Sequence, residues 1–307
     1  MSSAVQLLQL GGLYLEDGKG QGLRKRFVHR LFNLLTRWRV LQVFPRCNAD
    51  AASAFEQFLE RYRQSTGAKP VLVICGNATS SGENADLAKY KQYRDVVLRP
   101  RSQFIVDLPG QNDVLANAAL SDVFDSDRSK FLLTERHMIC MHTLPSQHSR
   151  PTKTDIGGRY KSEDLGRVAF HIKQFDEEAR ERSLRAVHLL VTFDSPRLKF
   201  AEGNFDPESG RHLLKFCLHH GIPGILSKTG NFPKTLTFPS RDEPPWPPVV
   251  PCPDAFVNAA NYPGTFVIHE FEDAEPARLH WGIRLVQLSS PPYRFAPASA
   301  VYAETLL

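Results

Sequence analysis

The sequence predicts a layered α/β protein built from two stacked mixed β-sheets flanked by helices. Short apolar runs rich in β-branched residues alternate with amphipathic helical patterns over the first two thirds of the chain. This alternation is typical of strands and helices that pack in layers. The final third has a proline-rich stretch followed by strand-like segments, which indicates closing antiparallel strands. With 42% hydrophobic and 23% charged residues in 307, the composition excludes a disordered or fibrous chain.

The first half of the chain reads as alternating strands and helices. Residues 5–10 predict an opening strand, and Asn48 can cap a helix that carries Phe55 and Leu59 on one face. A Gly-Asn turn ends the next strand at Cys75. The remaining elements expected here are a strand at 70–75, a helix over 82–93, a strand at 104–106 and a turn at 109–110.

The second half continues this pattern and then departs from it. We expect a helix over 164–182, a strand at 186–191, a helix over 208–220 and a strand at 224–226. Two more strands are expected at 265–269 and 283–287. We therefore predict one domain over 1–290, with a basic helical segment at 21–41, a proline-rich loop at 239–253 and a C-terminal tail at 291–307.

The basic segment is the densest concentration of positive charge in the chain. Its apolar residues recur at roughly helical spacing, which predicts an amphipathic helix or helix pair. A solvated face over a core-facing stripe and a docking surface for an acidic partner both fit this pattern. Nucleic-acid binding is a third reading, although a net charge of +5 does not favour it. The candidate partner-binding residues are Arg24, Lys25, Arg26, Arg30, Arg37 and Arg39.

Cysteine usage and hydropathy indicate the cellular compartment of the protein. The five cysteines are odd in number and have no CxxC spacing, so we expect a reduced protein without a structural zinc site. Residues 1–13 are apolar only in patches and lack a charged leader. No stretch reaches the ~20 apolar residues that a membrane span needs. The expectation is a cytoplasmic protein that does not enter a membrane.

Two segments carry a resemblance to a known family. Residues 71–90 read as a strand, a Gly-Asn turn, a small loop and a helix, and residues 104–114 read as a strand followed by Pro-Gly-Gln-Asn-Asp. Together they resemble the calcineurin-like metallophosphoesterase superfamily. In that family an aspartate stands where this chain has Asn77. Asparagine and histidine stand where it has Gln111 and Asn112.

Three shorter segments extend the resemblance over residues 6–288 in the family's order. Gly12 and Tyr14 fall at the Asp-x-His pair, and Phe193 falls in the run that carries a lone histidine. Thr229 and Asn231 replace the histidines of the Gly-His-x-His pair. Every ligand position of the family's two-metal site therefore holds a residue with poor metal chemistry.

The resemblance implies a four-layer α/β/β/α sandwich of two mixed β-sheets flanked by helices. Two-metal hydrolysis needs carboxylate and imidazole ligands that hold two cations about 3.5–4 Å apart. Because these ligands are missing, we expect no bound metal or other cofactor and no hydrolysis. The expected function is that of a pseudoenzyme, a protein-binding or scaffolding subunit of a complex. Its expected partner is an active relative or a neighbouring-gene product.

The alternative is a divergent phosphoesterase or phosphodiesterase with a rebuilt active site. It would use Asp113, Asp194 or a histidine group formed by His137, His142 and His148. The five-residue spacing of His137 and His142 places them on opposite faces of a strand. They would not converge on one metal, so a structural role is expected for them.

Overall fold

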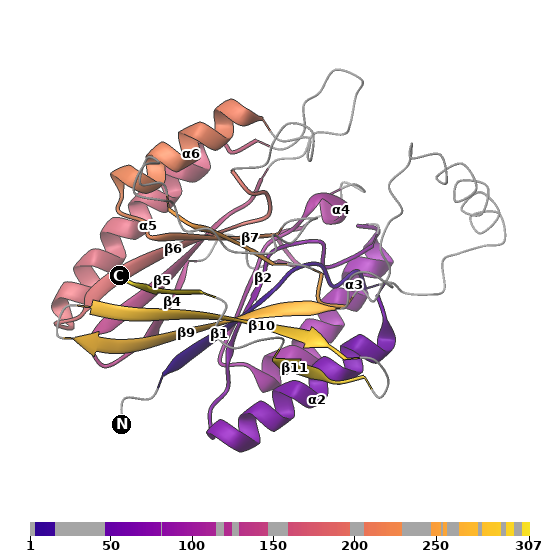
Figure 1. Ribbon diagram of the computed structural model, residues 1–307. Coiled ribbons are helices and arrows are strands. Elements are labelled where there is room, and N and C mark those ends of the chain that lie inside the picture. Colours follow the sequence, from indigo (N-terminus) through magenta and orange to yellow (C-terminus); the bar gives the residue numbers. More distant parts are fainter. Residues whose placement is uncertain are drawn as a thin grey trace.

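The protein is a mixed α/β structure with two mixed β-sheets, as the sequence predicts (Figure 1). The computed structural model describes residues 4–15, 47–80, 82–114, 120–124, 129–146, 159–196, 206–228, 247–252, 254–256, 264–275, 278–289, 293–297 and 303–307. The basic segment at 21–41 lies outside these residues, and so does most of the loop at 239–253. No helix among the described residues is long and apolar enough to span a membrane.

The first sheet has the order β11-β10-β9-β1-β2-β3, and β12 also pairs with β10. Strands β1, β2 and β3 run parallel, whereas all pairings of β9 and β10 are antiparallel. Its strands are β1 (Val5–Leu10), β2 (Val71–Ile74), β3 (Ile105–Asp107), β9 (Thr265–Glu275), β10 (Arg278–Leu288), β11 (Phe295–Pro297) and β12 (Ala303–Leu306).

The second sheet has the order β4-β5-β6-β7-β8. Strands β5 to β8 are parallel and β4 pairs antiparallel with β5. The strands are β4 (Lys130–Leu133), β5 (His137–Leu144), β6 (Arg185–Thr192), β7 (Gly224–Lys228) and β8 (Val249–Cys252). Pro251 lies in β8, where an edge position tolerates a residue without an N–H group.

Two of the helices begin where a polar side chain satisfies free backbone N–H groups. Asn48 accepts hydrogen bonds from the backbone N–H groups of Asp50 and Ala51, as the sequence predicts. Asp206 caps α6 in the same way. The helices are α2 (Ala49–Thr66), α3 (Asn84–Tyr93), α4 (Gln111–Val114), α5 (Ser162–Glu181) and α6 (Pro207–His219), with π-helical and 3₁₀ turns at Arg94–Leu98 and Arg99–Arg101.

Four apolar clusters of described residues hold these elements together, and the three largest join the layers. Leu7, Leu189 and Trp281 belong to the cluster shared by the two sheets. Successive residues of a strand face opposite sides, so Leu8 instead packs with Phe55 of α2 in a second cluster. A third cluster joins α5 and α6 to the second sheet, and Figure 1 shows these helices beside β4 to β7.

A chain of hydrogen bonds crosses between the sheets inside the apolar cluster that they share. Trp281 Nε1–H donates to His269 Nδ1 at 3.0 Å, and His269 Nε2 lies 2.8 Å from Gln9 Oε1. The Gln9 amide nitrogen donates to the backbone carbonyls of Ser227 and Val250, each at 3.1 Å. Because the indole only donates, His269 must carry its proton on Nε2. Donors and acceptors are then matched along the whole chain.

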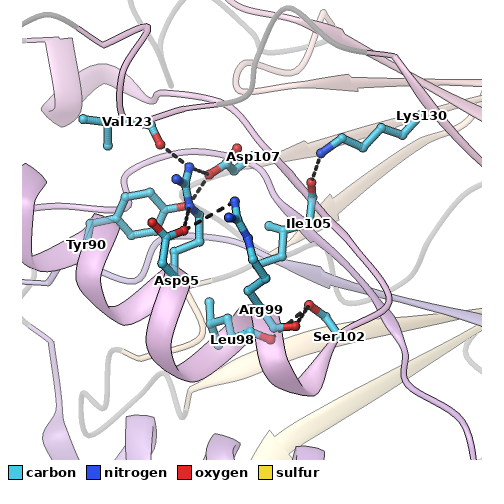
Figure 2. A network of polar contacts seen from close by, with 10 residues as sticks. Tyr90, Asp95, Leu98, Arg99, Ser102, Ile105, Asp107, Val123 and Lys130 are labelled. Atoms are coloured by element: carbon cyan, nitrogen blue, oxygen red, sulfur yellow. Dashed lines mark hydrogen bonds and ion pairs between the residues drawn. The ribbon is translucent and has the colours of Figure 1, made fainter.

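A second buried network fixes the end of β3 (Figure 2). Arg94 Nη1 contacts Asp107 Oδ2 at 3.1 Å and also donates to the carbonyl of Val123. Tyr90 Oη donates to the same Asp107 oxygen at 2.6 Å, and Arg94 Nε contacts Asp95 at 3.0 Å. Burial raises the pKa of Tyr90, and Asp107 raises it further, so the phenol stays a donor. The network attaches α3 and residues 120–124 to the sheet.

The carboxyl-terminal residues differ from the expectation of a tail after residue 290. Phe295–Pro297 and Ala303–Leu306 each pair antiparallel with β10. Each strand is too short to show an alternating pattern, and its pairing depends on β10. The terminal residues therefore complete the first sheet.

The buried His269 predicts a stability loss in acid. Burial lowers its pKa from 6.5 to about 3, so the unfolded chain binds a proton that the folded protein excludes. The free energy of unfolding should then fall as pH drops from 6.5 toward 3, by at most ~1.4 kcal/mol per pH unit for this group. His269→Gln should reduce this slope in urea titrations between pH 6.5 and 4.5. The exposed control His212→Gln should leave the slope as it is in the wild type.

Candidate functional site

The carboxyl ends of strands from both sheets meet at one place. Gly12 and Tyr14 follow β1, Asn77 follows β2, and Phe193 follows β6. Lys228 ends β7, and Asp254 follows β8. We call these six residues the strand-end cluster. Four of them, Gly12, Tyr14, Asn77 and Phe193, are positions at which the family resemblance placed former metal ligands.

Asp254 organises the cluster. Its Oδ1 accepts a hydrogen bond from the Gly12 backbone N–H at 3.0 Å and lies 3.2 Å from Lys228 Nζ. Its Oδ2 accepts from Tyr14 Oη, also at 3.2 Å. Tyr14 Oη in turn accepts from Asn77 Nδ2 at 3.2 Å. One carboxylate therefore links the ends of β1, β7 and β8, and the phenol extends the link to β2.

Lys228 supplies the positive charge of the cluster. Its side chain is only 8% exposed, and its Nζ lies 5.6 Å from the ring centroid of Tyr14 and 5.5 Å from that of Phe193. Burial by itself would lower the pKa of Lys228, but Asp254 and Tyr14 outweigh it and raise the pKa above 10.5. The group is therefore a charged ammonium held by a carboxylate and two aromatic faces.

Tyr14 remains a neutral phenol. Burial raises its pKa above 10.0, and Lys228 opposes this rise only in part. A protonated phenol donates one hydrogen bond, here to Asp254. It offers no anionic oxygen to a cation.

Glycines allow the side chains of the cluster to fill its centre. A Cβ at Gly12 would lie 2.2 Å from Tyr14 Cε2 and 2.6 Å from Asp254 Oδ1. A Cβ at Gly110, after β3, would lie 2.3 Å from the Asn77 backbone nitrogen and 2.7 Å from Phe193 Cε2. Such separations are shorter than any tolerated contact. Aromatic rings therefore occupy the space that larger residues at these glycine positions would require.

The backbone is strained at the same place. Tyr14 and Asn77 have φ angles of 54° and 50°, in the left-handed region. Asparagine tolerates this region, whereas a tyrosine there is unfavourable and must be held by its surroundings. The Asn77 carbonyl accepts hydrogen bonds from the N–H groups of Leu13 and Tyr14 at 3.0 and 3.1 Å. The loops after β1 and β2 are thus held together by backbone hydrogen bonds.

Asp113 joins the loops after β2 and β3. Its carboxylate accepts from the backbone N–H groups of Gly110, Ala78 and Thr79 at 2.8, 3.1 and 2.8 Å, and from the Thr79 hydroxyl at 2.7 Å. Burial raises its pKa, and these hydrogen bonds oppose the rise. A carboxylate with four donors acts as a structural clamp on these two loops.

The structure describes only some of the positions that the sequence singled out. Gln111 and Asn112 lie in α4, but their side chains are outside the description, and Thr229 and Asn231 lie outside the described residues. The same holds for the six cationic residues of the basic segment and for His148. His137 and His142 point to opposite sides of β5, as expected, and His137 contacts Asp273 at 2.5 Å.

Asp254 is the residue that sequence reasoning missed. No motif of the family resemblance covers it, and its partner Tyr14 is 240 positions away. Its nearest signal is its place just after the stretch expected as a proline-rich loop at 239–253, in which the structure shows the strand β8. Without knowledge that β8 joins the second sheet beside β7, that signal cannot be read.

The described residues do not fit a two-metal centre. Such a centre needs several carboxylate and imidazole ligands. The cluster offers one carboxylate that is already paired with an ammonium, together with a neutral phenol, an amide and a phenyl ring. Among the described residues, no group of three His, Cys, Asp or Glu side chains could hold a metal ion.

Comparisons with known proteins leave the family open. No family model and no curated protein matches the chain. Among solved structures, the chain is similar to one titled "GAP50 the anchor in the inner membrane complex of Plasmodium". The identity is 11% and the TM-score 0.48, with 99% of this chain and 88% of that chain covered. A likeness at this level carries no argument about activity or partners.

The Lys228–Asp254 pair predicts a measurable coupling. Lys228→Met leaves the mostly buried Asp254 carboxylate without its cation and should lower the free energy of unfolding by about 3 kcal/mol. Adding Asp254→Asn should cost less than the sum of the two single changes, because the unpaired charge is gone. Urea unfolding of the four proteins measures this coupling, with the exposed Lys215→Met as the control. Strict additivity would contradict the pairing.

Proposed function

We propose that this protein is a catalytically inactive metallophosphoesterase-like protein that acts as a protein-binding subunit of a complex. In this proposal its two sheets and flanking helices form the family's four-layer α/β/β/α sandwich. The observation that carries the proposal is the Lys228 ammonium, paired with Asp254 at the point where the strand ends converge. If an internal ion pair had replaced the family's metal site, the result would be an ammonium and a carboxylate at the convergence of the strand ends, as in this protein.

Electrostatics supports the loss of metal binding. A divalent cation in the cluster would stand a few ångströms from a fixed ammonium, and repulsion between like charges is strong where water is excluded. The one carboxylate of the cluster already neutralises Lys228. The rings of Tyr14 and Phe193 flank that ammonium. A metal would have to displace an ion pair and two aromatic side chains.

The strand-end loops are compatible with a binding role. Tyr14 and Asn77 have left-handed backbone conformations, and the Asp113 clamp holds the neighbouring loops. Loops that are held in one conformation can serve a partner without any catalysis. We propose an active relative or a neighbouring-gene product as the partner, in the cytoplasm, with the cationic residues of the basic segment meeting acidic groups on it.

Metal titration tests the inactive site. We expect sub-stoichiometric binding of Mn²⁺ or Zn²⁺ by calorimetry, and no turnover of bis-p-nitrophenyl phosphate, because the donor set does not fit. A matched variant combines Gly12→Asp, Tyr14→His, Asn77→Asp, Phe193→His and Lys228→Ser. It should gain measurable metal affinity, because it removes the Tyr14 ring that lies nearest to a side chain at position 12 and the Lys228 ammonium that holds Asp254 beside it. Two tight metals in the unmodified protein would refute the proposal.

Charge reversal tests the binding surface. Arg26→Glu, Arg30→Glu and Arg37→Glu together should abolish capture of the native partner, with little change in thermal stability because exposed charges contribute little to folding. The control reverses Arg61, Arg63 and Lys69, which are exposed cations on and after α2. The partner is first identified by co-purification from the native host. Binding of each variant is then measured by reconstitution with that partner. If both variants bind equally well, the basic segment is only a solvated surface.

A further inference from the structure

A line of hydrogen-bonded side chains lies between the second sheet and α5, away from the strand-end cluster. Ser129 Oγ lies 3.0 Å from His142 Nδ1, and His142 Nε2 lies 2.9 Å from His188 Nδ1. His188 Nε2 lies 3.1 Å from Asp176 Oδ1. We call these four residues the Ser129 relay. His171 Nδ1 adds a second contact to Ser129 Oγ at 2.9 Å.

The proton positions along the relay follow from its acidic end. An ionised Asp176 only accepts, so His188 donates through Nε2 and accepts through Nδ1. His142 then donates through Nε2 and accepts through Nδ1, which leaves the Ser129 hydroxyl as the donor. Burial, followed by the neighbouring His188 and His171, lowers the pKa of His142 to about 3. His142 is therefore neutral, and its unprotonated Nδ1 faces the Ser129 hydroxyl.

The side chains at the two ends of the Ser129 relay are more exposed to solvent than those in its middle. His142 is fully buried and His188 is 5% exposed, whereas the Asp176 side chain is 47% exposed. Ser129 is half-buried. A hydroxyl that reaches the surface is thus joined to a carboxylate through two buried imidazoles. The same order of groups, with one imidazole, activates serine nucleophiles on several unrelated folds.

We propose that Ser129 is a nucleophile, activated through His142, His188 and Asp176, that attacks activated carboxylic esters. This site is separate from the inactive metal site proposed above, because His142 and His188 face α5 whereas Met141 and Leu189 on the same strands face the other sheet. Ser129 is the catalytic residue. His188 and Asp176 are positioning residues that act through His142.

The reaction balances as acyl transfer to the serine and then to water. Ser129 Oγ bonds to the ester carbonyl carbon, and its proton passes to His142 Nδ1 while the proton on His142 Nε2 moves to His188 Nδ1. His188 becomes an imidazolium that donates through Nε2–H to the Asp176 carboxylate. The ester C–O bond breaks, and the proton returns along the relay to the departing alcohol. Water then attacks the acyl-serine in the same way and releases the acid.

A fluorophosphonate probe tests this proposal on the full chain. Attack by Ser129 forms an Oγ–P bond and expels fluoride, and peptide mass spectrometry locates the adduct. We expect labelling of Ser129 in the folded wild-type protein and none in Ser129→Ala. The matched control Ser65→Ala removes an exposed hydroxyl of α2 and should label at the wild-type rate. Absence of a Ser129 adduct in the wild type overturns the proposal.

The exposed end of the relay provides a test that does not depend on core folding. Asp176→Asn should slow labelling by roughly 10²-fold, the low end of general-base contributions. Asp176→Glu keeps a carboxylate and should retain most of the rate, whereas a merely structural contact would give no such rescue. Glu177→Gln, the neighbouring exposed carboxylate on α5, should change nothing. Labelling of Asp176→Asn at the wild-type rate overturns the proposal.

Discussion

The hydrogen-bond chain from Trp281 through His269 to Gln9 fixes how the two sheets lie against each other. Gln9 belongs to β1, yet its amide donates to the carbonyls of Ser227 in β7 and Val250 in β8. An unsatisfied amide in that apolar cluster would be strongly unfavourable, so a slip between the sheets is excluded. Ser227 immediately precedes Lys228, and Gly12 follows Gln9 by three positions. This hydrogen-bond chain therefore places the end of β1 against the end of β7.

The strand-end cluster is a set of mutually dependent residues. Tyr14 fits only because position 12 is glycine, and Phe193 fits only because position 110 is glycine. The Tyr14 hydroxyl needs Asp254 as its acceptor, and Asp254 needs Lys228 as its counter-charge. Changing one member leaves a clash or an unpaired charge. A single substitution that introduces a metal-binding side chain would therefore meet a filled, charge-balanced site.

The sequence predicts the elements whose positions depend on local pattern. It does not predict the elements and contacts that depend on pairing between distant segments. Apolar periodicity gives β1, β2, β6 and α5, and Asn48 marks the start of α2 because a cap acts within three residues. The order of the short motifs also identifies four of the positions that meet at the strand ends, Gly12, Tyr14, Asn77 and Phe193. Asp254 is missed because its partners are about 240 residues away, and β11 and β12 are missed because β10 supplies their pairing. His142 is correctly separated from His137, but its partner His188 lies 46 positions further on.

The alternation of side chains along β5 and β6 gives this molecule two chemically independent surfaces. Met141 and Leu189 face the apolar cluster shared with the first sheet, while His142 and His188 face α5. Substitutions at the strand ends therefore need not disturb the imidazoles, which depend on Asp176 and Ser129 for their proton positions. The side chains at the strand ends therefore place no constraint on chemistry across the other face of the second sheet. In a layered fold, the two faces of one sheet can carry unrelated polar groups.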